Sequence, residues 1–291
     1  MNSLRIATWN VNSVRLRRPI LEDYIHKHQP DILCLQETKV VNQDFPTSFF
    51  HQLGYPYQEI AGMKSYNGVA ILSKIPLTAN PIRSWCSMHD CRHLSVELPG
   101  GLVIHNFYVP AGGDIPDPHL NKKFAHKLSF VREMADFLKS THNTDQPVVI
   151  LGDFNIAPSP FEVWSHQQLI DVVSHTPVEV DLLNSVQQSL NWVDAVRQFF
   201  PETQKLYSWW SYRATDWKKS NRGRRLDHIW ITPKLRPFLQ KALIVEDARG
   251  WQPSIITLKN AATGGSTIIR ITDESSARVS SEVFTLRYLR R

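Results

Sequence analysis

Short apolar runs that are closed by turn residues recur along the chain and predict buried strands. Seven segments carry this pattern, at residues 4–9, 31–36, 69–72, 102–109, 148–151, 226–231 and 242–245. Apolar residues at helical spacing appear between some of these runs, along segments 16–24, 124–138 and 193–200. Because predicted strands outnumber helices and no internal repeat is visible, we expect an α/β sandwich, with two packed sheets and helices outside.

Size and charge narrow the class of protein only a little. The 291 residues are 42% hydrophobic, which is enough for a substantial core. The net charge of +6 favours a polyanionic partner, but residues 255–291 hold six Lys/Arg against three Asp/Glu and so supply half of it. With three unpaired cysteines, no leader and no long apolar run, we expect a soluble cytoplasmic protein without a membrane partner.

Two of the apolar runs end at residues that carry oxygen ligands. Asn10 follows the run 4–9, and Glu37 follows the run 31–36. If those strands are neighbours, both side chains reach one rim of a sheet, where hard oxygen donors suit Mg²⁺ or Mn²⁺ with several waters retained. Taken singly, each residue has a plainer interpretation. Asn10 can be a turn residue at the end of a strand, and Glu37 can be an exposed charge.

A second polar group follows the run 148–151. Gly152 allows the chain to turn tightly, and Asp153 and Asn155 lie two residues apart, so their side chains can point the same way. Hydrolysis of a phosphodiester needs a positioned water and stabilised charge on the phosphate oxygens, and a carboxylate beside a metal can supply the first. The alternative is a turn in which the Asp side chain simply ends a strand.

Two further candidates lie at the ends of other predicted strands. Tyr108 closes a long apolar run before a Pro- and Gly-containing loop, although a tyrosine there is most often a half-buried core residue. Asp227 lies in the block Arg225-Leu226-Asp227-His228. We expect His228 to face away from Asp227, because adjacent side chains of a strand alternate between its faces.

In their order along the chain, these blocks resemble the exonuclease III family of apurinic/apyrimidinic endonucleases, from residue 4 to residue 254. The matching blocks are Thr8-Trp9-Asn10-Val11-Asn12, Leu35-Gln36-Glu37-Thr38-Lys39, Asn106-Phe107-Tyr108, Gly152-Asp153-Phe154-Asn155 and Arg225-Leu226-Asp227-His228. The resemblance implies a four-layer α/β sandwich of two mostly antiparallel mixed sheets flanked by helices. We expect one catalytic domain over residues 1–258 and an atypical tail over 259–291.

The resemblance assigns roles to the matching residues. Glu37 becomes the principal ligand of Mg²⁺ or Mn²⁺, with Asn10 beside it. Asp153 orients or deprotonates the attacking water. Asn155 and Tyr108 hydrogen-bond the phosphate.

A basic and aromatic segment between these blocks is a candidate for DNA binding. Five of the eight residues 218–225 are basic, and large aromatics lie just before them. Basic side chains bind phosphates and aromatics stack on bases, although such a run is usually only a solvated loop. The resemblance places DNA contacts at Trp210, Arg213, Asn221, Arg222 and Trp251, the last in the pocket for a sugar without its base.

The pattern breaks after Ser254. Family members carry Ser-Asp-His there and a supporting carboxylate that matches Asp227, but this chain runs from Ser254 directly into an apolar segment at 255–258 that reads as the final strand. No histidine follows His228. Because one positioned acid-base group contributes about 10² to 10⁴ in rate, we expect reduced cleavage with metal and DNA binding retained.

Three hypotheses for the function remain open at this point. The leading one is a monomeric, Mg²⁺-dependent DNA repair phosphodiesterase that cuts duplex DNA beside abasic sites and trims 3′ ends. The alternative is a catalytically inactive DNA-binding relative of that nuclease. A hydrolase of phosphoinositides or phospholipids is disfavoured by the basic and aromatic segment and by the lack of a lipid-anchoring stretch.

Overall fold

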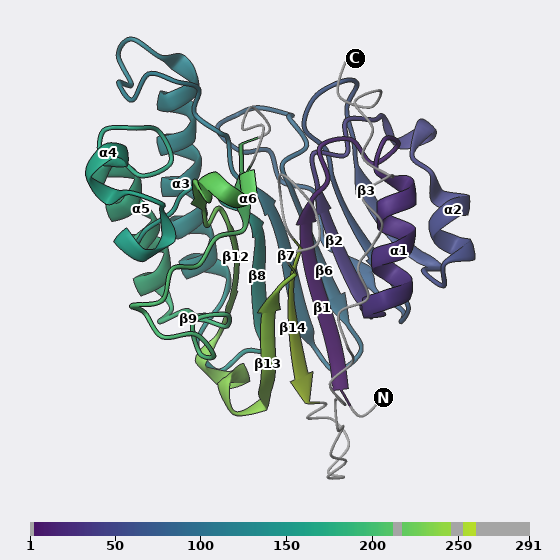
Figure 1. Ribbon diagram of the computed structural model, residues 1–291. Helices are drawn as coiled ribbons and strands as arrows, with labels where there is room; N and C mark the ends of the chain where they lie inside the picture. The colour runs from purple at the N-terminus through teal and green to yellow at the C-terminus, as the bar shows by residue number, and fades with distance from the viewer. Residues whose placement is uncertain (1–2, 212–216, 246–252, 260–291) are drawn as a thin grey trace.

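Two six-stranded sheets pack face to face at the centre of the molecule (Figure 1). The computed structural model describes residues 3–211, 217–245 and 253–259. The first sheet has the order β13 (Leu239–Ile244), β14 (Ser254–Lys259), β1 (Ser3–Asn10), β2 (Ile32–Gln36), β4 (Val69–Ser73) and β3 (Tyr57–Ala61). The second has the order β5 (Thr78–Ala79), β6 (His93–Leu98), β7 (Leu102–Tyr108), β8 (Val148–Asp153), β12 (Asp227–Ile231) and β9 (Val193–Asp194).

Both sheets are mixed. Strand β1 runs parallel to β2, and β7 runs parallel to β8. The other neighbouring pairs of the two sheets are antiparallel. A separate ribbon joins β10 (Trp209–Trp210) to β11 (Gly223–Arg224).

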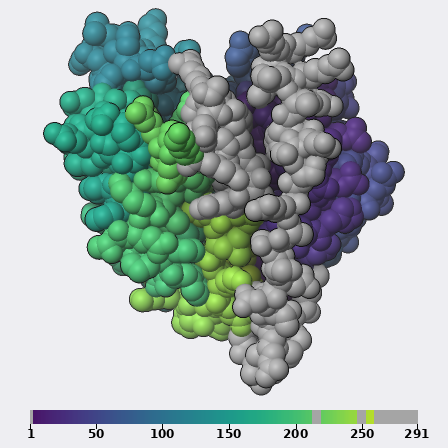
Figure 2. Space-filling view, in the orientation of Figure 1, coloured from purple at the N-terminus to yellow at the C-terminus, as the bar shows by residue number. Residues whose placement is uncertain are grey.

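Helices cover the outer face of each sheet and complete four layers (Figure 1). The first sheet is covered by α1 (Arg18–His28) and α2 (Thr47–Gln52), and the second by α3 (Lys122–Thr141) and α5 (Pro177–Ser189), with α4 (His166–Leu169) beside them. Further short helices of the described chain lie in loops, at η1 (Asn42–Asp44), η2 (Pro160–Glu162), η3 (Pro233–Phe238) and α6 (Trp217–Ser220). Figure 2 shows the same division on the surface, with purple and blue residues on one flank and teal residues on the other.

Alternation along the central strands creates three hydrophobic cores. In β1, Ile6 packs between the two sheets, whereas the next residue, Ala7, packs beneath α1 and α2. In β8, Val149 likewise faces the opposing sheet and Ile150 faces α3 and α5. A fully buried aliphatic side chain contributes about 1.5–3 kcal/mol, so this alternation fixes which face each strand presents.

Most of the predicted elements are confirmed, and one is wrong. All seven apolar runs form strands, and the segments 16–24 and 124–138 lie in or overlap α1 and α3. The apolar segment after Ser254 is the predicted final strand, β14, between β1 and β13. Segment 193–200 is not a helix. Strand β9 ends at Asp194, whose Oδ1 accepts hydrogen bonds from the backbone N–H groups of Val196 and Arg197 and closes a turn.

The predicted tail lies outside the described residues except for Lys259, the last residue of β14. Within the described part of the chain, every helix is too short or too polar to cross a membrane.

Candidate active site

The strand topology brings the polar blocks to one rim of the two sheets. Because β1 and β2 are parallel, Asn10 and the residue before Glu37 end side by side, at the upper rim in Figure 1. Strands β7 and β8 are also parallel, so Tyr108 lies opposite Asp153. Strand β12 begins at this rim with Asp227, which pairs with Asp153 across an antiparallel ladder. The rim therefore collects carboxylate, amide and phenol groups from five strands.

Asn10 connects the two sheets at this rim. Its side chain is buried, and Nδ2 donates to Glu37 Oε1 at 3.0 Å and to Asp153 Oδ2 at 2.8 Å. Its Oδ1 accepts from the backbone N–H of Asn12 at 3.1 Å, which fixes the orientation of the amide. Three residues that are far apart in sequence therefore form one hydrogen-bonded group.

The turn after β8 presents Asp153 and Asn155 together. Only glycine fits at position 152, because a Cβ there would lie 1.9 Å from the carbonyl oxygen of Phe107. Asp153 Oδ1 accepts from the backbone N–H of Asn155 at 2.9 Å, and Oδ2 accepts from Asn155 Nδ2 at 3.1 Å. Asn155 has a φ of 53° and also donates from Nδ2 to Val109 O at 2.9 Å. This turn holds both side chains towards Asn10.

Tyr108 faces the same group from β7. Its phenol hydrogen-bonds with Glu37, and its ring lies beneath the guanidinium of Arg92, 4.7 Å from the ring centroid. Burial, followed by the charges of Glu37 and Asp153, raises the pKa of Tyr108 well above its usual value. The phenol therefore keeps its proton and can donate a hydrogen bond to an anion.

Asp227 adds a third carboxyl group to the buried rim. Its Oδ2 accepts from Ser208 Oγ at 2.7 Å, whereas Oδ1 has no hydrogen-bond partner among the described residues. Burial and the neighbouring Asp153 raise the pKa of Asp227 well above its usual value. Burial and the charge of Glu37 raise the pKa of Asp153 to about 7, against hydrogen bonds from Asn10 and Asn155. The rim thus gathers three carboxyl groups, and burial favours the protonated form of Asp227.

This donor set fits a hard divalent cation. Among the described residues, no three His, Cys, Asp or Glu side chains are arranged to hold a metal unaided. Mg²⁺ and Mn²⁺ need only one or two carboxylates with water and substrate phosphate. Glu37 supplies one, and its Oε2 is paired with Lys39 Nζ at 2.8 Å, so a cation bound there would compete with Lys39. Asp227 Oδ1, which is buried and has no hydrogen-bond partner among the described residues, is a further oxygen available at this rim.

The predicted DNA-contacting residues have different environments. Trp210 is only 4% exposed and donates from Nε1 to Asn221 Oδ1 at 3.1 Å, so it shapes the loop but offers little ring surface for stacking. Arg222 is exposed, and its guanidinium lies 4.7 Å from the ring centre of Trp164. The remaining two predicted contacts, Arg213 and Trp251, lie outside the described residues.

All twelve histidines lie among the described residues, and His228 is the one next to the site in sequence. As expected, it faces away from Asp227. Its Nε2 donates to Ile156 O at 2.9 Å, and its ring stacks on Phe154 on the side of the helices. Burial and the charge of Arg225 lower the pKa of His228 to about 4. His228 therefore lies on the far side of the sheet from the candidate site.

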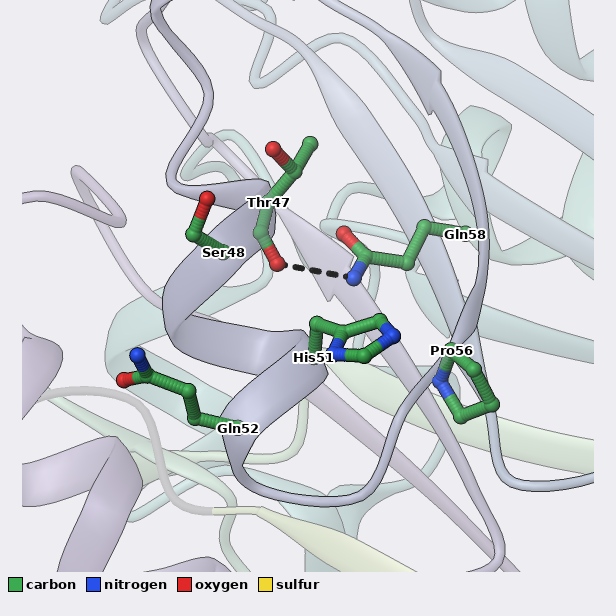
Figure 3. A pocket seen from close by; sticks show the side chains of 6 residues that line it. All are labelled: Thr47, Ser48, His51, Gln52, Pro56 and Gln58. Carbon is green, nitrogen blue, oxygen red and sulfur yellow. Dashed lines mark hydrogen bonds between the residues drawn. The ribbon is translucent and has the colours of Figure 1, made fainter.

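A surface pocket beside α2 is separate from this rim (Figure 3). It is lined by Thr47, Ser48, His51, Gln52, Pro56 and Gln58. Within the pocket, the side chain of Gln58 donates a hydrogen bond from Nε2 to the backbone carbonyl oxygen of Thr47 at 3.0 Å. None of the catalytic candidates lines this pocket, and it brings together no charged acid-base pair.

The chain is similar in sequence to proteins of known function. The profile of the Endonuclease/Exonuclease/phosphatase family matches residues 7–273. Exodeoxyribonuclease III of Haemophilus influenzae is 28% identical over 250 residues, which cover 80% of this chain and 89% of that protein.

Solved structures share the four-layer fold. An AP endonuclease from Archaeoglobus fulgidus has a TM-score of 0.80 at 30% identity, covering 88% of this chain and 99% of its own. A 3′-5′ exonuclease from Neisseria meningitidis has a TM-score of 0.77 at 26% identity, covering 88% of this chain and 100% of its own. The predicted resemblance and the predicted fold are thus confirmed, and the chain belongs to the Endonuclease/Exonuclease/phosphatase family.

Proposed function

We propose that this chain is a divalent-metal-dependent DNA phosphodiesterase that cuts duplex DNA 5′ to abasic sites and trims 3′ ends, acting as a monomer. The observation that carries the proposal is the hydrogen-bonded group of Asn10, Glu37 and Asp153 at one rim of the sandwich. Its relatives include an exodeoxyribonuclease III, an AP endonuclease and a 3′-5′ exonuclease, which are enzymes that act on DNA.

Each residue at the rim has a role in this reaction. Glu37 would hold Mg²⁺ or Mn²⁺, with Asn10 beside it orienting the carboxylate through Nδ2. The ion would polarise the phosphate and stabilise its developing charge. Asp153, hydrogen-bonded to Asn10 and Asn155, accepts a proton from the attacking water. Asn155 and Tyr108 donate hydrogen bonds to the phosphate oxygens. Asp227 supports Asp153 from the adjacent strand.

The DNA lies, in this proposal, across the rim and the basic loop. The exposed guanidinium of Arg222 contacts a backbone phosphate, and Asn221 and Trp210 hold the shape of its loop. Arg213 and Trp251 are proposed to contact DNA on the strength of the sequence alone. Trp251 lines the pocket for a sugar that has lost its base.

The absent Asp-His pair after Ser254 limits the expected rate. A catalytically inactive DNA-binding protein remains the second candidate, because Asp227 Oδ1 has no partner where a hydrogen-bonding group is expected. We expect slow but metal-dependent cleavage, about 10² to 10⁴ below that of a relative with a complete site.

The test is incision of a duplex that contains one tetrahydrofuran abasic analogue. Cleavage should require Mg²⁺ or Mn²⁺ and fall at least about 10²-fold in Glu37→Ala. Glu22→Ala, an exposed carboxylate on α1, is the matched control and should cleave like the wild type. Equal cleavage with a chelator present would refute the proposal. Tight binding of the duplex without any turnover would select the inactive DNA-binding protein instead.

A further inference from the structure

A fully buried lysine lies directly behind the catalytic turn. Lys127 belongs to α3 and has 0% exposure. It stands on the apolar face of that helix, between Phe124 and Val131, where a hydrophobic residue is the ordinary choice. A charged group in such a position is costly unless all of its donors are satisfied, and its presence calls for a reason beyond packing.

Lys127 Nζ has three partners from three different segments. It forms an ion pair with Glu179 of α5, whose side chain is also fully buried. It donates to the carbonyl oxygen of Asn155 at 2.8 Å and to that of Ala111 at 3.3 Å. One ammonium group therefore joins α5, the turn after β8 and the loop after Tyr108.

Glu179 is itself anchored by neighbours other than Lys127. It accepts from the backbone N–H groups of Ser174 and Thr176 and from the hydroxyl of Thr176, at 2.6 to 3.1 Å, in a capping box at the start of α5. These hydrogen bonds hold the Glu179 carboxylate in place independently of Lys127. Lys127, paired with this fixed carboxylate, in turn fixes the position of the Asn155 carbonyl oxygen.

The backbone of Asn155 needs such a support. Its φ of 53° is an uncommon conformation for a residue with a side chain, and it aims Asn155 Nδ2 at Asp153 Oδ2. The carbonyl that Lys127 binds belongs to this same residue. Gly112, in the loop that carries the third partner, packs so closely on the lysine stem that a Cβ would lie 2.9 Å from Lys127 Cδ.

We propose that Lys127, paired with Glu179, is a positioning residue for the nuclease: it holds the Asn155 carbonyl so that the Asn155 and Asp153 side chains keep their catalytic orientation. This inference rests on the proposed function for its effect on rate. Its effect on the geometry of Asn155 is independent of any activity.

The test separates positioning from simple stability. Lys127→Met alone leaves Glu179 buried without a cation and should unfold at a lower denaturant concentration. The double variant Lys127→Met/Glu179→Gln removes both charges together. Its single glutamine oxygen can still accept from the backbone N–H and the hydroxyl of Thr176, so stability should recover towards the wild-type value.

Two measurements on the double variant then decide the role of Lys127. Hydrogen exchange of the Asn155 side-chain amide, followed by NMR in protein with labelled asparagine, should become about 10-fold faster as the turn loosens. The turnover rate on the abasic duplex with saturating Mg²⁺ should fall about 10- to 100-fold, with duplex affinity changed less than 3-fold. Unchanged exchange at Asn155, or full wild-type turnover in the double variant, would overturn the inference.

Thr232→Val is a control at the other end of the same strands. Thr232 Oγ1 donates to Gln146 O at 2.7 Å and accepts from Val148 N at 3.1 Å, so its loss weakens β8 and β12 away from the catalytic rim. This variant should lose stability without any change in Asn155 exchange or in turnover. A wild-type protein that fails to cut the duplex would refute the proposed function, whereas the exchange measurement would still decide the role of Lys127.

Discussion

Asn106 shows how one buried amide joins the two sheets beneath the catalytic rim. Its Nδ2 donates to Leu35 O and to Ala70 O, both at 3.0 Å, and its Oδ1 accepts from Gln36 Nε2 at 2.6 Å. The amide belongs to β7 in the second sheet, whereas all three partners belong to β2 and β4 in the first. Because the side chain is fully buried, water cannot replace any of these hydrogen bonds.

Replacement of Asn106 by leucine should therefore destabilise the protein strongly. The change leaves two backbone carbonyls and one amide donor without their partner, and each unsatisfied buried group costs about 1–3 kcal/mol. We expect a loss of about 3 kcal/mol or more in the free energy of unfolding, measured by urea denaturation. Ile104→Val, in the same strand, is the control and should cost only about 1 kcal/mol. A loss no larger than that of the control would contradict this account of Asn106.

At the scale of elements, β14 shows how the apolar segment after Ser254 joins the first sheet. Ile256 packs between the sheets and Ile255 packs towards α1, so a slip of one residue would move each side chain to the wrong face. The hydrogen-bonded pairing of β14 with β1 on one side and β13 on the other also fixes the register of β14. An insertion before Ile255 must therefore be absorbed on the Ser254 side, at the rim where Asp227 lies.

Insertion of Asp-His between Ser254 and Ile255 should accordingly raise the cleavage rate. In the proposed function, the imidazole would supply the acid-base group that the resemblance leads us to expect after Ser254. We expect an increase of about 10² or more in single-turnover incision of the abasic duplex. An Ala-Ala insertion at the same place adds equal length without an imidazole and should give no gain. Equal rates for the two insertions would show that the break in the pattern has been placed wrongly.

The sequence predicts the elements whose signals are local. Apolar runs closed by turn residues identified the central strands, because each of these strands is buried on both faces. The helix predicted over 193–200 is wrong, because the apolar spacing suits a helix but the side chain of Asp194 closes a turn there. Helix α5 was missed although the capping box formed by Thr176 and Glu179 can be read from the sequence.

The candidate site was predictable only in part. The motif residues Asn10, Glu37 and Asp153 do meet, but their spacing alone does not reveal that Asn10 connects the two carboxylates. Lys127 was missed because its partners lie on three separate segments. The available signal was a lysine on the apolar face of a predicted helix. Trp164 carried no signal until the structure placed it beside Arg222.

For the molecule as a whole, a chain of three histidines links the surface to the core beside α3. Gln146 Oε1 accepts from the backbone N–H of Asn143 at 3.1 Å, which identifies this atom as the amide oxygen. Because an amide oxygen only accepts, His142 Nδ1, 3.4 Å away, must be the donor of the hydrogen bond between them. Nε2 of His142 is then an acceptor for His105 Nε2–H at 2.8 Å, and His105 Nδ1 accepts from His93 Nε2–H at 3.0 Å. In this arrangement each ring is neutral. A proton added to His105 Nδ1 would point at the N–H of His93 Nε2, and the two donors would repel each other.

This arrangement predicts a loss of stability in mild acid. Burial, and then the charge of Arg83, lowers the pKa of His93 to about 3, whereas an unfolded histidine has a pKa of about 6.5. Between these values the unfolded chain binds a proton that the folded protein does not, so stability falls as the pH falls. The raised pKa values of Asp153 and Asp227 act in the opposite direction over the same range, so the wild-type curve alone mixes both effects.

The difference between the wild type and His93→Gln isolates the histidine, because the carboxylate contributions cancel. Glutamine keeps a donor for His105 but does not titrate, so the variant should lose about 1 kcal/mol less than the wild type between pH 7 and pH 5.5. Urea denaturation at the two pH values measures this difference. His51→Gln, on the surface helix α2, is the matched control, a histidine replaced outside this chain of rings. Parallel curves for the wild type and His93→Gln would mean that His93 is protonated in the folded protein, and the neutral chain of rings would then be incorrect.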